Sequence, residues 1–448
     1  MRRVVCIAPK AHSTTASELS VLTTPLTGIS ILGTMLDQQG YDVTIIDESI
    51  KIPQYQHIEA EYVFISAMSA TVKRAYDLAD MFKERGTNIF MGGLHTTFRP
   101  KEALSHCDKV VVGEGEHVLD DLFSKQSQKI IQGKQVLHLD DIPLPDYQLI
   151  QGMPKHPKVV SICSSRGCPF SCRFCSLQSM FGKPFRSMST SKVITYLKQF
   201  SHIKNLCFDE PNFTADKQRA IDILTQMKDH GISPKYAWPS VSIDVARNEK
   251  LLQLCSEVAD FHFLIGLESI NEKVLKSYNK KHRPEQMKQD IKKLHDYGIK
   301  VQGSFIFGSD LDDISVFQKT VDFCQDADVD FPGFFPLTPY VGTEIRKDLE
   351  DQHRIFTDDW DYYDGAHVVF YPKQMTPLEL QQGVIDAFQS FYSGKKILHH
   401  FSQGELFIAG QTTAFKLLIK RIIHRHQYYL EYLEEKEKEK KELERYEF

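Results

Sequence analysis

The stretch Cys163-Ser-Ser-Arg-Gly-Cys-Pro-Phe-Ser-Cys-Arg-Phe-Cys-Ser176 contains a C-x3-C-x2-C pattern. Thiolates at this spacing on one loop can each bind one iron of a four-iron, four-sulfur cluster. The fourth iron is then left without a protein ligand, and a second molecule can bind the metal at that open position. The pattern therefore predicts a reactive [4Fe-4S] site held by Cys168, Cys172 and Cys175.

Other uses of cysteine fit this pattern less well. A structural zinc site needs four ligands, often from two C-x2-C pairs, and no second Cys/His pair follows at finger-like spacing. A two-cluster ferredoxin has a C-x2-C-x2-C-x3-C-P run instead. A disulfide framework is typical of short exported chains, whereas this chain has 448 residues. The remaining six cysteines are predicted to be structural thiols in strands or helices: Cys6, Cys107, Cys163, Cys207, Cys255 and Cys324.

The composition is that of a globular protein with room for two or three domains. Hydrophobic residues make up 42% and charged residues 25% of the chain. The net charge of -5 gives no sign of a nucleic-acid-binding surface. The first apolar run is too short for a secretory signal, and no stretch approaches the roughly 18 apolar residues of a membrane span. We therefore expect a cytoplasmic protein without a transmembrane segment.

The first 140 residues alternate between strand and helix patterns, as in a doubly wound parallel sheet. Several predicted strands end in glycines, which let the backbone approach a ligand at the carboxyl edge of the sheet. A proline-rich linker follows at residues 141–157. Strands are predicted at 3–8, 41–47, 62–66, 88–91 and 110–112, and helices at 29–39 and 73–85.

A second alternation runs through residues 158–345 and predicts a partial (β/α)6 barrel of the TIM type. Its chemistry is expected at the carboxyl ends of the strands, and the cysteine loop follows the first of them. Residues 346–448 are predicted to be mostly helical, with a capping box at Thr376 and Glu379. The six strands are predicted at 159–163, 205–209, 236–243, 261–266, 300–308 and 333–336.

The cysteine triplet, with Phe174 before its last member, resembles the signature of the radical S-adenosylmethionine (radical SAM) superfamily. The resemblance implies that SAM binds the open iron and is cleaved to a 5'-deoxyadenosyl radical. It also implies that Asp209 and Glu210 contact the SAM amino group and that Glu268, with Ser269, holds the ribose. Gly303 and Phe305 would pack against adenine. Considered alone, these residues also fit a solvated strand-end turn and ordinary core strands.

The N-terminal half resembles the cobalamin-binding, Rossmann-like domain that precedes many radical SAM barrels. The resemblance rests on five stretches in order: Pro25-Leu-Thr-Gly28, the segment 40–47, Ser66-Ala-Met-Ser69, Met91-Gly-Gly-Leu-His95 and Gly113-Glu-Gly-Glu116. The D-x-H-x-x-G motif is absent, so no residue is assigned as an axial cobalt ligand, and a domain that keeps the shape without the cofactor is the alternative. The implied cobalamin-binding residues are Ser66, Ser69, Gly92, Gly93, Gly113, Gly115 and Glu116.

Several other side chains are each compatible with two interpretations. Arg186 either neutralises cluster or carboxylate charge or lies on the surface, and His12 and His95 are expected to be loop or core histidines. The basic stretch 415–426 either lies on a membrane surface or packs on the barrel with its basic face in water. The aromatic residues of the C-terminal region are expected in the core more often than in a substrate pocket: Trp360, Tyr362, Tyr363, His367, Phe370 and Tyr371.

Taken with the resemblance, the sequence predicts a cobalamin-dependent radical SAM C-methyltransferase that acts on an unactivated carbon. A non-methylating cyclase or rearrangement enzyme with the same cofactors is the first alternative. An iron–sulfur electron carrier or a cobalamin-binding sensor is the alternative from another class. The expected partners are a small-molecule, lipid or peptide substrate and a one-electron reductant such as flavodoxin or ferredoxin.

Overall fold

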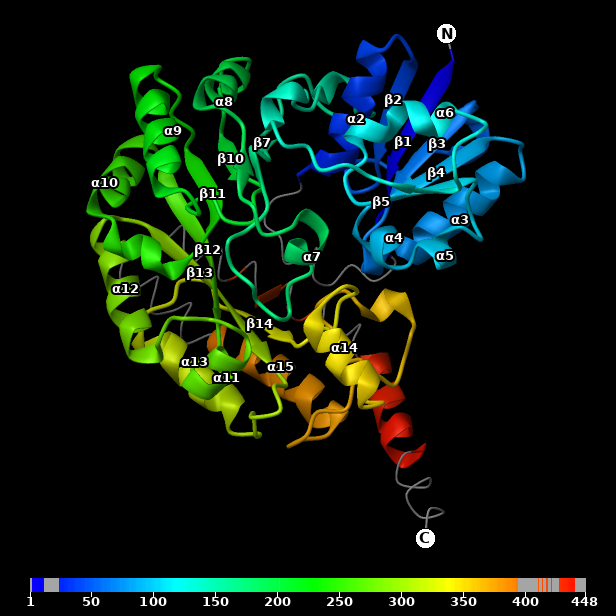
Figure 1. The fold of residues 1–448 in the computed structure, drawn as a ribbon. Helices are drawn as coiled ribbons and strands as arrows, with labels where there is room; N and C mark the ends of the chain where they lie inside the picture. The colour runs from blue at the N-terminus through cyan, green and yellow to red at the C-terminus, as the bar shows by residue number, and fades with distance from the viewer. Residues whose placement is uncertain are drawn as a thin grey trace.

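The computed structural model describes residues 2–11, 24–200, 202–393 and 427–439, together with isolated residues between 410 and 420. Two six-stranded sheets and a two-stranded hairpin organise this part of the chain. Figure 1 shows the N-terminal sheet, in blue and cyan, beside the second sheet, in green and yellow, with the C-terminal elements below them.

The N-terminal sheet is parallel throughout, with the strand order β2-β1-β3-β4-β5-β6. The chain leaves β1 to one side for β2 and returns to the other side for β3, so a topological switch point lies there. The short strand β6 was not predicted, because three residues are too few for a periodic pattern. The strands are β1 Arg3–Ala8, β2 Asp42–Asp47, β3 Tyr62–Ser66, β4 Asn88–Gly92, β5 Lys109–Val112 and β6 Ile130–Gln132.

Alternate residues of these strands pack on opposite faces, as a doubly wound sheet requires. Val5 and Ile7 of β1 belong to one hydrophobic core, and Val4 and Cys6 belong to the other. The predicted α/β sheet covered by helices on both faces is confirmed. The principal helices of this half are α2 Thr27–Gln38, α3 Val72–Lys83, α4 Leu94–Phe98, α5 Pro100–Ala103 and α6 Leu119–Phe123.

The second sheet has the order β14-β13-β12-β11-β10-β7, with every neighbouring pair parallel. Its end strands β7 and β14 do not pair with each other, so the predicted partial barrel is confirmed. The strands are β7 Val159–Ile162, β10 Asn205–Phe208, β11 Tyr236–Val241, β12 Asp260–Glu268, β13 Lys300–Phe307 and β14 Gly333–Pro336. The outer helices are α8 Thr190–Leu197, α9 Lys217–Asp229, α10 Glu249–Val258, α12 Pro284–Asp296 and α13 Val316–Asp326.

Side chains of the barrel strands alternate between the helix layer and the inner face. In β12, Phe261, Phe263 and Ile265 are almost fully buried in the main hydrophobic core. Leu264 and Gly266, which lie between and after them, are only half-buried. The inner face of the sheet is therefore more open than the face that packs against the helices.

A hairpin that the sequence did not predict surrounds the cysteine loop. β8 Ser165–Arg166 pairs antiparallel with β9 Arg186–Ser187, on either side of the three cysteines. The short helix α7 Leu177–Phe181 follows the last cysteine and lies between the two sheets in Figure 1. The loop is thus closed at its base by paired backbone.

The segment predicted as a linker, 141–157, packs against both sheets. Tyr147 is buried, and its hydroxyl accepts a hydrogen bond from Ser161 N at 2.9 Å and donates one to Ser161 O at 3.0 Å. Asp146 N donates to Thr34 Oγ1 at 2.9 Å, and Ile150 forms a bridge with Ile45 of β2. This segment is therefore a packed joint.

The C-terminal region follows the barrel with α14 Glu344–Asp351 and α15 Pro377–Phe391. α15 begins with the predicted capping box between Thr376 and Glu379. The preference for core over pocket is borne out for Trp360, Tyr363 and Phe370, which are buried, and for His367, which is 5% exposed. Most of the basic stretch 415–426 lies outside the described residues, as does His12.

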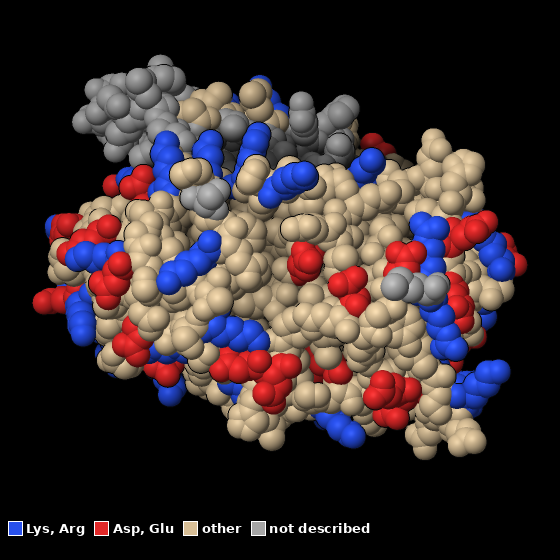
Figure 2. Space-filling view, turned by 90° about the horizontal axis from the view of Figure 1, so that it is seen from above, with Lys and Arg blue, Asp and Glu red and all other residues tan. Residues whose placement is uncertain are grey.

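No helix within the described residues is long and apolar enough to cross a membrane. On the face shown in Figure 2, acidic and basic side chains are interspersed among uncharged ones. This distribution agrees with the moderate net charge of -5.

Asp312 lies in the loop after β13 and is only 2% exposed. Its Oδ2 accepts hydrogen bonds from Gly308 N and Ser309 N, at 3.1 and 2.9 Å. Burial raises the pKa of Asp312 to about 6, despite these two hydrogen bonds. The folded state therefore holds this proton more tightly than the unfolded chain, where the pKa is about 4.

Asp312→Asn is accordingly expected to stabilise the protein at neutral pH. Stability of the wild type falls as pH rises from about 4 to about 6 because the buried carboxyl must ionise, whereas an amide keeps the acceptor oxygen without the charge. We expect a gain of about 1–2 kcal/mol at pH 7.5 that disappears near pH 4. Thermal unfolding of both proteins across this pH range measures the difference, and a difference that does not change with pH would contradict the assignment.

Candidate active site

The three cysteines of the predicted cluster lie on the loop after β7, and each is half-buried and unpaired. Burial raises the pKa of all three thiols, neighbouring thiols contribute to each shift, and Lys280 opposes it. Among the described residues, no three Cys, His, Asp or Glu side chains converge to hold one metal ion. A cluster does not need such convergence, because each cysteine binds a different iron. The loop therefore fits a [4Fe-4S] cluster better than a single ion.

Lys280 is a part of this site that the sequence analysis missed. Its ammonium lies 2.9 Å from Glu268 Oε1 and 3.3 Å from Gly266 O, and 5.8 Å from the ring centroid of Phe174. Burial lowers the pKa of Lys280, and the negative charges of Glu268 and Cys172 outweigh that and raise it. The lysine therefore keeps its charge beside the cysteine loop. It follows α11 Glu272–Ser277, so no local motif links it to the cysteines.

The two acidic residues after β10 have different surroundings. Asp209 is accessible to solvent, and yet the protein around it raises its pKa by desolvation, as expected for a group on the wall of a recess. Its Oδ2 accepts a hydrogen bond from Thr27 Oγ1 of α2 at 3.1 Å, across the boundary between the two sheets. Glu210 is buried and accepts hydrogen bonds from Ser164 and Ser165. Asp209 is thus the more available of the pair for a bound ligand.

Glu268 ends β12 in the left-handed region, with φ of 64°. A non-glycine residue rarely adopts this conformation, and such residues concentrate at functional sites. The turn that follows is closed by Asn271 N, which donates to Ser269 Oγ at 3.0 Å. Glu268 is therefore held rigidly beside Lys280, whereas Ser269 serves the local turn.

The two residues predicted to contact adenine lie on the helix-facing side of β13. Phe305 is fully buried in the main core, and a Cβ at Gly303 would lie 2.8 Å from Leu267 Cδ1. Ser304 and Ile306 are half-buried on the inner face of the same strand. The side chain of Phe305 thus serves packing, and an adenine contact at this strand falls to the inner-facing residues.

The glycines of the N-terminal sheet form tight turns at its carboxyl edge. Gly93 follows β4 with φ of 103°, and a Cβ there would lie 2.7 Å from Ala67 O. Gly113 follows β5 with φ of 88°, and its N–H donates to Thr97 Oγ1 at 3.0 Å. Ser66 and the loop that follows β3 lie beside Gly93, whose Cβ position is 3.0 Å from Ser66 Oγ. The Gly93 turn therefore packs tightly on the loop after β3, whereas nothing lies within 4 Å of the Cβ position at Gly113, so a ligand can approach the backbone there.

Glu114 and Glu116, which alternate with Gly113 and Gly115, join the N-terminal sheet to the hairpin. Glu114 Oε2 lies 2.8 Å from Arg166 Nη1, and its Oε1 lies 2.5 Å from Arg186 Nη2. Glu116 Oε1 lies 2.5 Å from Arg166 Nη2. All four charged side chains are buried. Glu116 is therefore engaged in a buried interface. Arg186 belongs to the same interface, where it neutralises the carboxylate of Glu114, so the alternative of a surface arginine is wrong.

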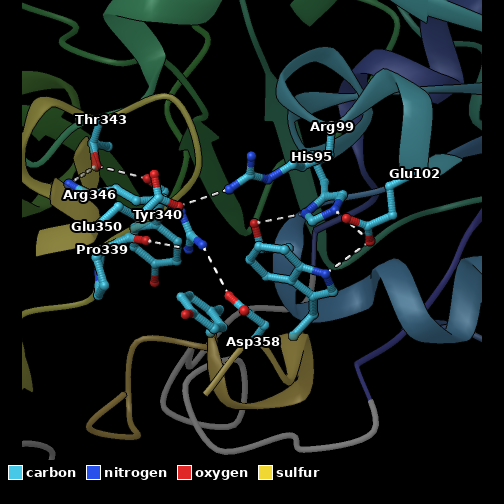
Figure 3. A network of polar contacts seen from close by, with 12 residues as sticks. His95, Arg99, Glu102, Pro339, Tyr340, Thr343, Arg346, Glu350 and Asp358 are labelled. Atoms are coloured by element: carbon cyan, nitrogen blue, oxygen red, sulfur yellow. Dashed lines mark hydrogen bonds and ion pairs between the residues drawn. The ribbon is translucent and has the colours of Figure 1, made fainter. Parts of the chain in front are cut away.

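His95 is fully buried, as expected for a core histidine. Its surroundings connect the N-terminal sheet to the C-terminal region (Figure 3) and are described below.

These contacts place the cysteine loop, at the carboxyl edge of the partial barrel, next to the glycine turns of a doubly wound domain. A barrel of this kind with a three-cysteine loop after its first strand, next to such a domain, defines the class of radical SAM enzymes that carry a B12-binding domain. Residues 162–324 match the family model of the radical SAM superfamily, and residues 20–123 match that of the B12 binding domain. The chain thus carries a radical SAM domain preceded by a B12-binding domain, and these two domains imply a [4Fe-4S] cluster, SAM and cobalamin as its cofactors.

Known relatives cover most of the chain. Bacteriochlorophyllide d C-12(1)-methyltransferase of Chlorobaculum tepidum is 28% identical over 415 residues, which are 89% of each chain. The anaerobic magnesium-protoporphyrin IX monomethyl ester cyclase of Cereibacter sphaeroides is 24% identical, covering 89% of this chain and 71% of its own. The radical SAM methyltransferase TsrM of Kitasatospora setae, solved with cobalamin and a [4Fe-4S] cluster, superposes with a TM-score of 0.65 at 12% identity, covering 88% and 89% of the two chains.

Proposed function

We propose that this protein is a cobalamin-dependent radical SAM C-methyltransferase that acts on an unactivated carbon. The observation that carries the proposal is the position of the cysteine loop against the carboxyl edge of the B12-binding domain, where Asp209 of the barrel and Thr27 of that domain lie 3.1 Å apart. Transfer of a methyl group from cobalamin to a substrate carbon requires that the reacting groups be held close together in a fixed orientation. The contact between the two sheet edges would bring the sites of the two cofactors together.

The cofactors supply the chemistry when bound: the cluster and SAM generate a carbon-centred radical, and cobalamin provides the methyl group. The chain's own residues bind and orient these groups. Cys168, Cys172 and Cys175 would hold the cluster, and Lys280 provides a positive charge beside it for a carboxylate or the cluster's own negative charge. Glu268 would accept hydrogen bonds from ribose hydroxyls.

The glycine turns and the 66–69 loop would hold cobalamin on the opposite side. We propose Gly92, Gly93, Gly113 and Gly115 for close backbone approach, because a glycine has no side chain to cover its backbone and nothing lies within 4 Å of the Cβ position at Gly113. Ser66 and Ser69 would supply hydroxyl groups from the same edge. Glu116 would act through the fixed position of its turn, since its carboxylate is engaged with Arg166.

Substrates with a tetrapyrrole ring are the class to test first, because the relatives that cover 89% of this chain are named for bacteriochlorophyllide and magnesium-protoporphyrin. The reaction is identified by the mass of the product. We expect a gain of one CH2 unit, carrying the isotope label when the methyl group of SAM is deuterated, together with 5'-deoxyadenosine.

An unlabelled product with an unchanged or dehydrogenated skeleton would favour the cyclase alternative, which the relative from Cereibacter sphaeroides represents. Absence of 5'-deoxyadenosine from the reduced, cluster-containing protein would contradict a radical SAM enzyme altogether. It would leave the electron-carrier or cobalamin-sensor reading.

Turnover also requires a one-electron reductant, and we propose an acidic flavodoxin- or ferredoxin-like protein in the cytoplasm. The exposed basic residues beside the cysteine loop support this partner. Asn279 Nδ2 donates to Ser171 O of that loop at 3.0 Å and so fixes the basic stretch next to it. Charge complementarity accelerates such encounters and makes them sensitive to salt. The exposed basic side chains of this stretch are Lys273, Lys276, Lys281 and Arg283.

A further inference from the structure

A polar network joins the B12-binding domain to residues 343–364, here called the bridging segment (Figure 3). His95 lies at its centre and has no exposed surface. Its Nδ1 is 3.2 Å from Ser69 Oγ, and its Nε2 is 3.5 Å from Glu102 Oε1. Trp360 of the bridging segment donates from Nε1 to the same Glu102 oxygen at 2.9 Å. One imidazole therefore lies between the 66–69 loop and a carboxylate that also binds the bridging segment.

On one side, the surroundings of His95 hold the 66–69 loop. His95 N donates to Ala67 O at 3.1 Å, in addition to the side-chain contact with Ser69. Gly93 packs so closely on this loop that an added Cβ would lie 2.7 Å from Ala67 O. The loop follows β3 and is one of the stretches that resemble cobalamin-binding domains. A displacement of the imidazole therefore removes its contact with Ser69 of this loop.

On the other side, Glu102 and Trp360 hold the imidazole. Burial alone would raise the pKa of Glu102, but its contacts with His95, Tyr76 and Trp360 lower it below the ordinary value, so the carboxylate stays charged. The indole ring packs edge-on against the imidazole, with ring centroids 4.6 Å apart. The seating of Trp360 therefore determines where Glu102 and His95 lie.

Trp360 is itself fixed from the barrel side. The guanidinium of Arg346 lies 5.0 Å from the indole centroid and donates to Pro339 O, just after β14, at 3.2 Å. Arg346 also donates to Glu350 at 2.6 Å, and Arg99 of the B12-binding domain lies 2.9 Å from the same carboxylate. A continuous chain of contacts thus runs from the end of the barrel to the 66–69 loop.

We propose that His95 is a positioning residue which couples the docking of Trp360 to the binding of cobalamin. The 66–69 loop binds the cofactor more tightly when Trp360 is seated on Glu102, and a bound cofactor favours the seated state by the same factor. The inference deepens the proposed function, because it rests on cobalamin as the cofactor of the N-terminal domain. With this coupling, the turn after β14, the last strand of the barrel, contributes to cobalamin binding.

The alternative is that the network only attaches the bridging segment, without influence on the loop. Lys73 separates the two cases, because it binds the same segment through ion pairs of 2.9 Å to Asp359 and Asp361 but does not touch His95. Lys73→Met removes these partly exposed ion pairs, which contribute little to the docking of the segment, and leaves the chain of contacts from Trp360 to Ser69 intact.

The test is a double-mutant cycle on the affinity of the cluster-containing protein for hydroxocobalamin, measured by equilibrium dialysis. Trp360→Phe keeps an aromatic ring but removes the N–H group that binds Glu102. His95→Asn keeps a group at the Nδ1 position that faces Ser69 and removes the arm that reaches Glu102. Each substitution is expected to weaken binding by about 5- to 10-fold, and the double variant by no more than either single one. Lys73→Met is expected to change the affinity less than about 2-fold.

Multiplicative effects in the double variant, unchanged affinity in the single variants, or an equal loss with Lys73→Met would each overturn the coupling. Binding of hydroxocobalamin by the wild type separates failure of the coupling from failure of the proposed function. If the wild type binds hydroxocobalamin, only the coupling is contradicted. If the wild type does not bind it, the proposed function is contradicted as well. Iron content and thermal unfolding monitor the fold. If Trp360→Phe does not fold, Glu102→Gln takes its place in the cycle and is expected to weaken binding to a similar extent.

Discussion

Replacing Cys172 with alanine is expected to abolish both the iron–sulfur absorbance of the reconstituted protein and the formation of 5'-deoxyadenosine. A cluster held by three thiolates loses a third of its protein ligands in this variant, and Cys168 and Cys175 alone cannot fix the iron that binds SAM. Because cluster and SAM act as one unit, we expect a loss of more than about 1000-fold in SAM cleavage rather than a graded reduction. Anaerobic absorbance, iron and sulfide content and product analysis measure these properties.

Cys163→Ala is the matched control. Cys163 directly follows β7 and lies five positions before the first cysteine of the triplet. Burial raises the pKa of its thiol well above the ordinary range, and its Sγ contacts Ser165 O at 3.4 Å. Cys163 also lies before β8, outside the loop between β8 and β9 that carries the three cluster cysteines. We expect this variant to retain the cluster, and a cluster that survives in Cys172→Ala instead would refute the ligand assignment.

Removing Glu114 is expected to cause the largest loss of stability among the substitutions considered. Burial alone would raise the pKa of this carboxyl, and the guanidinium groups of Arg186 and Arg166 outweigh that effect and lower it. Glu114→Ala leaves Arg186 without its carboxylate partner and Arg166 with Glu116 alone, inside the protein. Breaking a buried ion pair in this way costs about 3–5 kcal/mol. Urea and thermal unfolding, followed by circular dichroism, measure the loss.

Glu344→Ala is the comparison for this prediction. Glu344 forms an ion pair of 2.9 Å with Arg173, but its side chain is 66% exposed. Exposed pairs contribute at most about 1 kcal/mol. Equal destabilisation by the two variants would show that the buried ion pairs of Glu114 contribute no more to stability than the exposed ion pair of Glu344. A larger effect of Glu114→Ala, with cobalamin binding also weakened, is expected because Gly113 and Gly115 flank this residue.

The local patterns of the sequence predicted the two sheets and the cysteine loop because strands, turns and a loop motif are properties of neighbouring residues. The alternation of residues along a strand also predicts which side chains face the helix layer. In β13, Val301, Gly303, Phe305 and Phe307 are buried and the residues between them are half-buried. This period of two assigns Phe305 to the helix-facing side, so Ser304 and Ile306 are better placed for the adenine contact.

What the sequence did not reveal consists of pairs that are distant along the chain. Glu114 meets Arg186 and Glu102 meets Trp360 only after the domains have packed, and Glu268 meets Lys280 only after α11 has folded back on the end of β12. No periodicity or spacing encodes such pairs. Each charged partner, considered alone, could equally be a solvated residue on the surface. For this reason Arg186 was not recognised as an interface residue.

The barrel is open between β7 and β14, because these two end strands do not pair with each other. In a closed β-barrel, the interstrand hydrogen bonds fix the circumference, so widening the barrel requires that hydrogen bonds be broken. Here the two margins can move apart without that cost, since neither is paired across the gap. An enzyme with this architecture can therefore accommodate substrates of different size while the cysteine loop keeps its position.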